Sequence, residues 1–294
     1  MSVRIVTEST GDLPLSYIKE HNITVLSFPV TIGGKEYLVG PDETQPGNIS
    51  VDAFYKRIAE GERATTAQIP LDTYLNVFKS ALEQGDDVLY LCFSSGLSGT
   101  LNTARLAAQE LAEQYPAAKI LIVDTLAASL GEGIIAAKTV EKMEKEGGTV
   151  QELAAYAESL VQKIKHWFTV NDLHYLAKGG RLSGSTAFVG TLLSVKPVMD
   201  VSVEGKLVPR EKIQGRKKAL KAIADKYLAH GDPANQPLHI SYAGCEEDAL
   251  FVKNYVEEKG GSVGLTAQIT PVIVSHTGLG VIALFYFSDD PRNP

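Results

Sequence analysis

The stretch from Val88 to Gln114 constrains the fold of this chain more than any other part of its sequence. It opens with six apolar residues, Val88 to Phe93, passes through a Ser/Gly turn, and continues with apolar residues three and four positions apart. This order predicts a strand, a turn and a helix. A strand without polar alternation is buried on both faces, as in a parallel α/β sheet, and such sheets bind ligands at the carboxyl ends of their strands. The turn lies at that end.

The turn at 94–100 gathers hydroxyl side chains and small residues around the expected helix start. They are Ser94, Ser95, Gly96, Ser98, Gly99 and Thr100. Free backbone N–H groups at a helix start, beside several hydroxyls, can hold an anion. An ordinary helix cap, which uses one hydroxyl, explains the same residues. On this stretch alone both interpretations stay open.

Strands and helices alternate through the first part of the chain. A buried strand at 3–6 leads into a second hydroxyl-rich turn, a threonine-containing connection at 64–70 follows, and another strand at 119–123 ends at Asp124. This alternation predicts a three-layer α/β/α domain with a mostly parallel sheet over residues 1–165. The remaining pattern, over 166–294, predicts a second, two-layer α/β domain with a mixed sheet.

Composition excludes several classes of protein. The net charge of −7 and pI near 5.5 argue against a general nucleic-acid binder. The apolar runs fall short of the ~18 residues of a membrane span, and Glu8 comes too early for a secretory signal, so we expect a cytoplasmic protein without stable membrane insertion. Cys92 and Cys245 lie in or beside predicted core strands, which favours buried thiols over a disulfide or a metal site.

Several separate stretches, in order along nearly the whole chain, resemble the DegV family, whose members include the fatty-acid-binding B subunits of bacterial fatty acid kinase. The stretches are Ile5–Ser9, Asp12–Pro14, Thr66–Gln68, Ser94–Thr100, Val123–Asp124, Ser129–Gly131, Leu176–Ser183, Lys196–Pro197, Gly215–Ala219 and His276–Gly278. Each is weak alone, and together they are specific. The chain departs from the usual family pattern at Glu8, Ala67 and Leu279, where Asp, Ser and Pro are usual.

The resemblance implies a fatty acid held between two domains. Its carboxylate is expected to bind Thr66, Ser98 and His276, with Thr277 as a further contact. The resemblance also implies that the protein itself performs no chemistry and needs neither a cofactor nor a metal. An ATP-dependent kinase subunit is expected to phosphorylate the bound fatty acid to an acyl phosphate, which feeds phospholipid synthesis.

Simple energetics agree with an uncharged head-group site. A fatty acid buries about fifteen methylenes, worth on the order of 10 kcal/mol in total, so the tail supplies the affinity. Hydroxyls, a helix N-terminus and one histidine then suffice to avoid an unpaired buried charge. The loops at 65–68, 94–100 and 275–280 contain no Arg or Lys, which fits this expectation. A lone histidine in apolar surroundings is more often a hydrogen-bonded core residue, and the resemblance is what favours His276 as a ligand contact.

Two features of the second half each allow two interpretations. Arg181 follows two glycines, and the resemblance assigns it to contact with the kinase subunit, although a surface ion pair explains it equally well. The apolar run at 187–195 is a candidate for part of a tunnel wall. An ordinary core helix is the more frequent origin of such a run.

A hydrolase is the alternative function. Ser98 or Ser95 with His276 and Asp124 contains the residue types of a Ser-His-Asp triad. The G-x-S-x-G elbow of esterases is missing. Ser98 stands in Gly96-Leu97-Ser98-Gly99-Thr100, with Thr100 where the motif requires its second glycine. A kinase in its own right is a weaker third possibility, since the sequence has no Walker-type loop.

Overall fold

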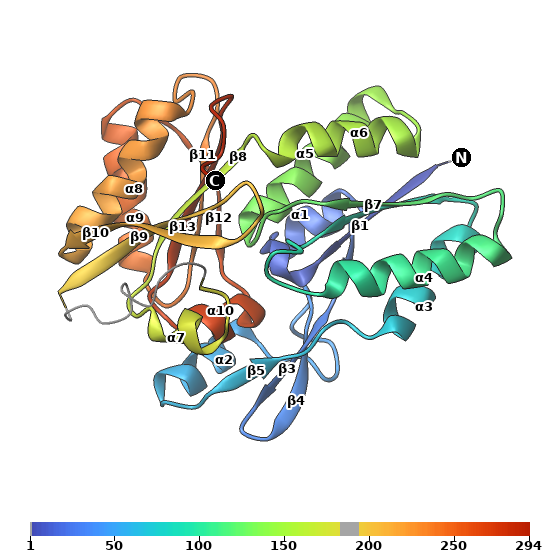
Figure 1. Ribbon diagram of the computed structural model, residues 1–294, viewed down its shortest axis with the longest axis horizontal. Helices are drawn as coiled ribbons and strands as arrows, with labels where there is room; N and C mark the ends of the chain where they lie inside the picture. Colours follow the sequence, from blue (N-terminus) through green and yellow to red (C-terminus); the bar gives the residue numbers. More distant parts are fainter. Residues whose placement is uncertain (1, 183–193) are drawn as a thin grey trace.

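The computed structural model describes residues 2–182 and 194–294, and its first large sheet is parallel throughout. The strand order is β2-β1-β6-β7, with bounds Thr24–Leu26, Val3–Glu8, Asp87–Cys92 and Ile120–Asp124. Helices cover both faces (Figure 1): α3 and α4 lie on one face, α5 and α6 on the other, with bounds Leu71–Glu83, Thr100–Gln114, Leu130–Glu146 and Val150–Val161. The predicted α/β/α arrangement is thereby confirmed.

A small antiparallel sheet extends from this domain, in the order β4-β3-β5. Its strands are Lys35–Val39, Phe28–Ile32 and Ala64–Thr66, and α1 (Leu15–Glu20) and α2 (Val51–Ala59) complete the region. The threonine connection, expected to be a loop, is therefore a short edge strand in which Thr66 pairs with Val30. This pairing fixes the position of Thr66.

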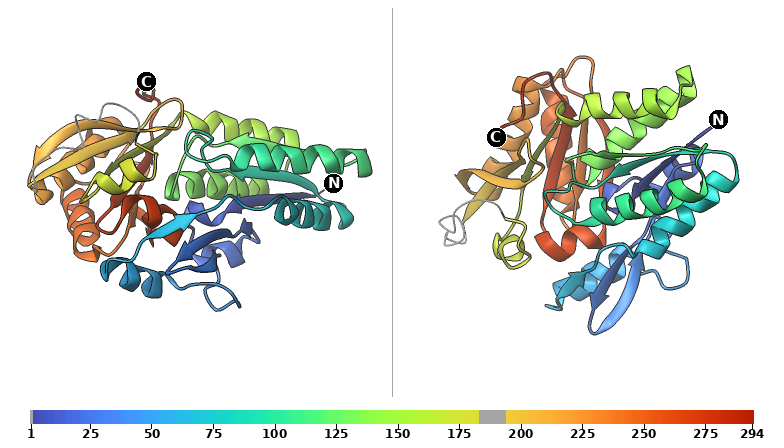
Figure 2. Two further views of the ribbon diagram at one scale, coloured as in Figure 1. Left: turned by 60° about the horizontal axis from the view of Figure 1, so that its bottom comes forward. Right: turned by 45° about the vertical axis from the view of Figure 1, so that its right-hand side comes forward.

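The second large sheet is mixed and has the order β10-β9-β8-β13-β11-β12. Its strands are Leu207–Gln214, Val195–Val201, Ile164–Thr169, Ile282–Phe287, Leu238–Tyr242 and Val263–Gln268. Helices α8 (Arg216–His230) and α9 (Glu246–Glu258) cover one face, while α5 of the first domain contacts strands of the same sheet (Figure 2). The predicted mixed sheet is also confirmed.

Three local expectations differ from the structure. The sequence pattern predicts a helix over 150–165, whereas α6 ends at Val161, and β8 already begins at Ile164 and pairs entirely within the second sheet. Strand β12 was not expected. The segment before the last strand, expected to be a loop, contains α10 (Pro271–Thr277), which begins with a proline at its first position. His276 therefore lies on a helix.

The two large sheets share one apolar core. Phe168, Met199 and Phe285 of the second sheet belong to the same buried cluster as the strands of the first. Several hydrogen bonds join the halves directly; for example, Tyr55 Oη donates to the carbonyl of Ile269 over 2.5 Å, and Ser94 Oγ donates to that of Gly205 over 2.8 Å. The halves therefore meet in a packed, hydrogen-bonded border.

The run at 187–195 lies mostly outside the described residues, so its role in a tunnel wall stays a prediction. Within residues 2–182 and 194–294, no helix combines the length and the apolar character that crossing a membrane requires.

Candidate functional site

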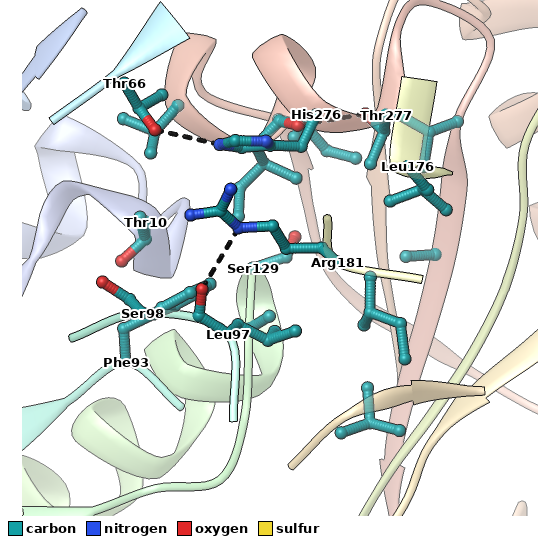
Figure 3. A pocket seen from close by; sticks show the side chains of 18 of the residues that line it. Thr10, Thr66, Phe93, Leu97, Ser98, Ser129, Leu176, Arg181, His276 and Thr277 are labelled. Carbon is teal, nitrogen blue, oxygen red and sulfur yellow. Dashed lines mark hydrogen bonds between the residues drawn. The ribbon is translucent and has the colours of Figure 1, made fainter. Parts of the chain in front are cut away.

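A cavity of about 290 Å³ lies at the border between the two halves (Figure 3). Its volume is at the lower end of the range of small-molecule pockets, about 300–1,000 Å³. Most of its wall is apolar and comes from both halves: Phe28, Phe93, Leu97, Phe168, Leu176, Val201, Leu207, Ile269, Val272, Ile273, Val281, Ala283 and Phe285. Loops at the carboxyl ends of β1, β6 and β7 contribute Thr10, Ser98, Gly99, Ala128 and Ser129, as expected for a parallel sheet, and β5 with the segment after it contributes Thr66, Ala67 and Gln68.

Thr66 and His276 form one polar part of the cavity wall. Thr66 comes from edge strand β5 and His276 from the last turn of α10, and Thr66 Oγ1 lies 2.9 Å from His276 Nε2 (Figure 3). The expected pair thus comes together from positions 210 residues apart. Burial, and secondarily the charge of Arg181, lowers the pKa of His276 to about 4. The imidazole is therefore neutral at physiological pH and offers one donor and one acceptor nitrogen.

Arg181 also lines the cavity, which the sequence did not indicate. Its guanidinium lies between His276 and the loop of Leu97 and Ser98, and its Nε donates to the carbonyl of Leu97 over 3.3 Å (Figure 3). The head-group site was expected to lack a full positive charge. The segment after α7 (His174–Lys178), outside the loops considered for the carboxylate, supplies that charge.

Ser98 lies opposite His276 across Arg181 (Figure 3). Its Oγ accepts hydrogen bonds from the backbone N–H of Thr100 over 3.3 Å and from the Thr100 hydroxyl over 3.2 Å. Because Ser98 is the acceptor in both, its own proton remains available to a ligand oxygen.

The backbone N–H groups of the serine turn are not free, in contrast to expectation. The N–H groups of Leu97 and Ser98 donate to the Ser94 carbonyl, and that of Gly96 donates to Ser94 Oγ. The turn is thus largely satisfied by its own atoms. Gly96 instead permits close approach of the second domain, since a Cβ there would lie 2.7 Å from the carbonyl oxygen of Glu204.

Thr277 lines the cavity but uses its hydroxyl elsewhere. Its Oγ1 donates to the backbone carbonyls of Ile273 over 3.2 Å and Gly278 over 3.1 Å. Figure 3 shows it on the far side of His276 from Thr66. Of the four expected ligand contacts, Thr66, Ser98 and His276 surround Arg181, whereas Thr277 lies apart and caps backbone groups.

Thr10 is a polar lining residue that the sequence analysis did not single out. Its hydroxyl bonds to Glu132 over 2.9 Å and to Glu8 over 3.3 Å. Burial raises the pKa of Glu8 to about 7 and that of Glu132 well above its usual value. Thr10 Oγ1 is the donor in these contacts, so the threonine proton is directed toward the buried acids and not into the cavity. The position of Thr10 in the turn directly after β1 was the feature of the sequence that could have indicated its place at the cavity.

Ser129 and Asp12 form a second pair in which a hydroxyl at the cavity wall donates to a buried acid. Ser129 lines the cavity and donates to the buried carboxylate of Asp12, whose other oxygen accepts from the backbone N–H of Thr270 over 2.8 Å. Burial raises the pKa of Asp12 to about 7. Asp12 therefore connects the starts of α5 and α10, the helix that carries His276.

The contacts of Asp124 and His276 do not form a catalytic triad. Asp124 Oδ1 accepts from the backbone N–H groups of Ser95 over 3.2 Å and Leu126 over 3.1 Å, and His276 Nε2 faces Thr66. No hydrogen bond connects His276 with Asp124 or Ser98 in the described part of the chain. Within residues 2–182 and 194–294, no cluster of His, Cys, Asp and Glu suited to a metal is found either. Hydroxyls, a neutral imidazole and a guanidinium are suited to bind an anion.

Comparison with known proteins gives relatives over the full length. DegV domain-containing protein YteA of Lactococcus lactis is 39% identical over 99% of this chain and all of its own. A DegV domain-containing protein of Clostridium perfringens is 36% identical over 97% of each chain.

Solved structures give the same result. A DegV family protein from Thermus thermophilus, described with fatty acid binding, has a TM-score of 0.87 and 32% identity, covering 98% of this chain and 100% of its own. A stearic-acid-binding protein from Eubacterium ventriosum has a TM-score of 0.87 and 26% identity, covering 98% of each chain. The model of the family described as "Uncharacterised protein, DegV family" matches residues 2–289. The chain belongs to the DegV family.

Proposed function

We propose that this protein binds a long-chain fatty acid in the cavity between its halves and presents the carboxylate to an ATP-dependent fatty acid kinase subunit. That subunit phosphorylates the carboxylate to an acyl phosphate for phospholipid synthesis, in the cytoplasm. The observation that carries the proposal is a mostly apolar cavity with Thr66 and His276 in contact at its polar part. Related proteins of the same fold from Thermus thermophilus and Eubacterium ventriosum are described as binding fatty acids.

The apolar wall supports a hydrocarbon ligand. Each methylene transferred from water contributes about 0.8 kcal/mol, so burial of a long acyl tail outweighs any single polar contact. The aromatic and aliphatic side chains that line the cavity, from Phe28 to Phe285, make no hydrogen bonds through their side chains and suit such a tail.

The polar residues support a carboxylate head group. Ser98 has a free proton, and the Thr66 and His276 pair can direct one proton into the cavity. Arg181 adds a guanidinium, which binds carboxylates through charge-assisted hydrogen bonds. Thr66, Ser98, His276 and Arg181 are our proposed head-group contacts, and Thr277 is proposed as a support for the helix end that carries His276.

A second, more polar cavity of about 540 Å³ supports presentation to a partner. Thr66, Arg181 and His276 line both cavities, and Arg63 and Lys178 line only the second one. A carboxylate beside the shared residues is therefore reached from a basic surface depression. A phosphate donor carried by another subunit is attracted to such a surface. This gives Arg181 a place in both the ligand site and the proposed contact with the kinase.

Extraction of lipid from the purified protein tests the proposal. We expect mass spectrometry to find one long-chain fatty acid per chain, and delipidated protein to rebind oleate in calorimetry. Thr66→Val keeps the shape of the side chain and removes its hydroxyl, and we expect it to weaken binding about tenfold, as for loss of one buried hydrogen bond. Thr66→Ser retains the hydroxyl and serves as the matched control.

Two results would contradict the proposal. One is the absence of bound lipid together with no uptake of oleate by the delipidated protein. The other is hydrolysis of acyl esters by the purified protein that Ser98→Ala abolishes, which would favour the hydrolase.

A further inference from the structure

We propose that a separate cavity behind His166 is a binding site for a phosphate-type oxyanion. The cavity has a volume of about 250 Å³ and is lined by Lys165, His166, Trp167, Asp200, Val201, Lys226, His230, Tyr286, Asp290, Pro291, Arg292 and Asn293. Of these residues, only His166 and Val201 also line the cavity proposed to hold the fatty acid. The proposal therefore concerns a second ligand and does not depend on the proposed fatty acid.

Two buried cations line this site. Lys165 is 8% exposed and Arg292 is 5% exposed. Lys165 Nζ donates to the backbone carbonyls of Gln162 and Asp290. Arg292 Nε donates to the carbonyl of Ile164 over 2.9 Å. Buried charges are normally paired with an opposite charge, and backbone carbonyls provide only part of that compensation.

Arg292 keeps one unused donor group. Its Nη1 donates to the carbonyl of Leu126 over 2.8 Å, whereas its Nη2 is buried and has no hydrogen-bond partner among the described residues. Both ring nitrogens of His166 are likewise buried without a partner among those residues. A buried guanidinium edge without an acceptor is rare, because the unmade hydrogen bond costs free energy. A bound oxyanion that reached this edge of the guanidinium would supply that acceptor.

The carboxylates that line the cavity have other partners. Asp200 accepts from Arg210 Nε over 2.8 Å and from Asn293 Nδ2 over 2.7 Å. Asp290 lies 3.1 Å from His230 Nδ1. Among the hydrogen bonds of the described chain, neither carboxylate contacts Lys165 or Arg292. Burial also lowers the pKa of Arg292 to about 10, although the charge of Asp200 acts in the opposite direction.

The chemistry of the lining selects the class of ligand. A guanidinium with a free N–H and a nearby ammonium group match the several oxygens of a phosphate group. The volume is several times the ~30 Å³ that one water occupies in the liquid, which leaves room for a phosphate ion or a small phosphate ester. Lys226, the third ammonium group of the lining, pairs with Glu211 over 2.7 Å and lies over the ring of Trp167.

Trp167 provides the readout, since it is the only tryptophan in the chain and it lines the cavity. We would titrate the full-length protein with inorganic phosphate at constant ionic strength, balanced with sodium chloride, and follow tryptophan emission. We expect a saturable change for phosphate and none for chloride. Lys165→Met should weaken phosphate binding about tenfold or more, as for loss of a charge-assisted hydrogen bond. Lys253→Met, on the exposed surface of α9, is the matched control and should bind like the wild type.

A second arm uses methyl phosphate. Binding of both probes identifies a site that accepts phosphate esters, and binding of inorganic phosphate alone identifies a site for the free ion. Arg292→Lys keeps the charge but removes the guanidinium, so it should bind more weakly than the wild type if Lys165→Met fails to fold. Equal responses to phosphate and chloride in the wild type would overturn the proposal. Equal weakening by Lys165→Met and Lys253→Met would overturn it as well.

Discussion

Arg181 and His276 together determine the charge at the polar part of the cavity between the halves. Desolvation keeps the imidazole of His276 neutral, and the guanidinium of Arg181 acts in the same direction by repelling a second positive charge. The site therefore carries one positive charge over the physiological pH range. A single cation can balance one carboxylate, while the neutral histidine and the hydroxyls of Thr66 and Ser98 supply hydrogen bonds.

Replacing Arg181 should raise the pKa of His276. In Arg181→Leu the repulsion is gone and burial remains, so the pKa should move up from about 4 without reaching the usual value. Histidine NMR signals followed against pH measure this shift. Lys178→Leu removes a charge from α7 nearby and should leave the titration of His276 unchanged. An identical pKa in Arg181→Leu and wild type would show that the two groups do not interact.

At the scale of elements, Asp12 connects three helices: η1 (Ser9–Gly11), α5 and α10. It follows the short 3-10 helix η1 and bonds to Ser129 at the start of α5 and to Thr270 at the start of α10. Asp12 itself has a positive φ of 50°, a conformation that costs free energy for a residue other than glycine. Its contacts hold that conformation and thereby set where α10 begins, which in turn places His276.

Asp12→Asn should flatten the dependence of stability on pH. The pKa of Asp12 is about 7 in the folded protein and 3.8 ordinarily, so the folded state holds more protons between these values. The contribution of Asp12 to the free energy of unfolding therefore falls as pH rises from about 4 to 7, by about 4 kcal/mol at most. Asparagine cannot ionise. The unfolding free energy of the wild type relative to the variant should fall over this range.

Urea unfolding at several pH values between 4 and 8 measures that difference. Glu8, whose pKa is also raised, is present in both proteins, so the difference isolates Asp12. Asp72→Asn, on the exposed side of α3, should preserve the pH profile of the wild type. Parallel profiles for Asp12→Asn and wild type would contradict the prediction.

The elements also show what local sequence can determine. Pro70 followed by a clear helical spacing predicts a helix from Leu71 to about Glu83, and α3 has these bounds. Helix α10 has seven residues, too few for a periodic pattern, and only Thr270 before Pro271 indicated its start. The position of Arg181 could not be read from its neighbours. It depends on how the chain after α7 folds over a cavity whose other walls come from distant segments.

At the scale of the molecule, one apolar core is shared by the two halves. The apolar cluster that contains Val88 of the first sheet also contains Phe285 of the second, and α5 packs against strands of both sheets. Neither sheet can lose its packing at this border without exposing the other. The cavity of about 290 Å³ lies in the same border, so a ligand there would contact both halves at once.

We therefore expect a bound fatty acid to raise the stability of the whole chain in a single unfolding transition. At a free ligand concentration about 100-fold above the dissociation constant, mass action adds about 2.7 kcal/mol to the free energy of unfolding. Calorimetry of delipidated protein with and without oleate measures this gain. Thr66→Val should show a smaller gain at the same oleate concentration, because its affinity is lower, whereas Thr66→Ser should resemble the wild type. Two separate transitions, of which oleate shifts only one, would show that the halves unfold independently and that the ligand is held by one of them.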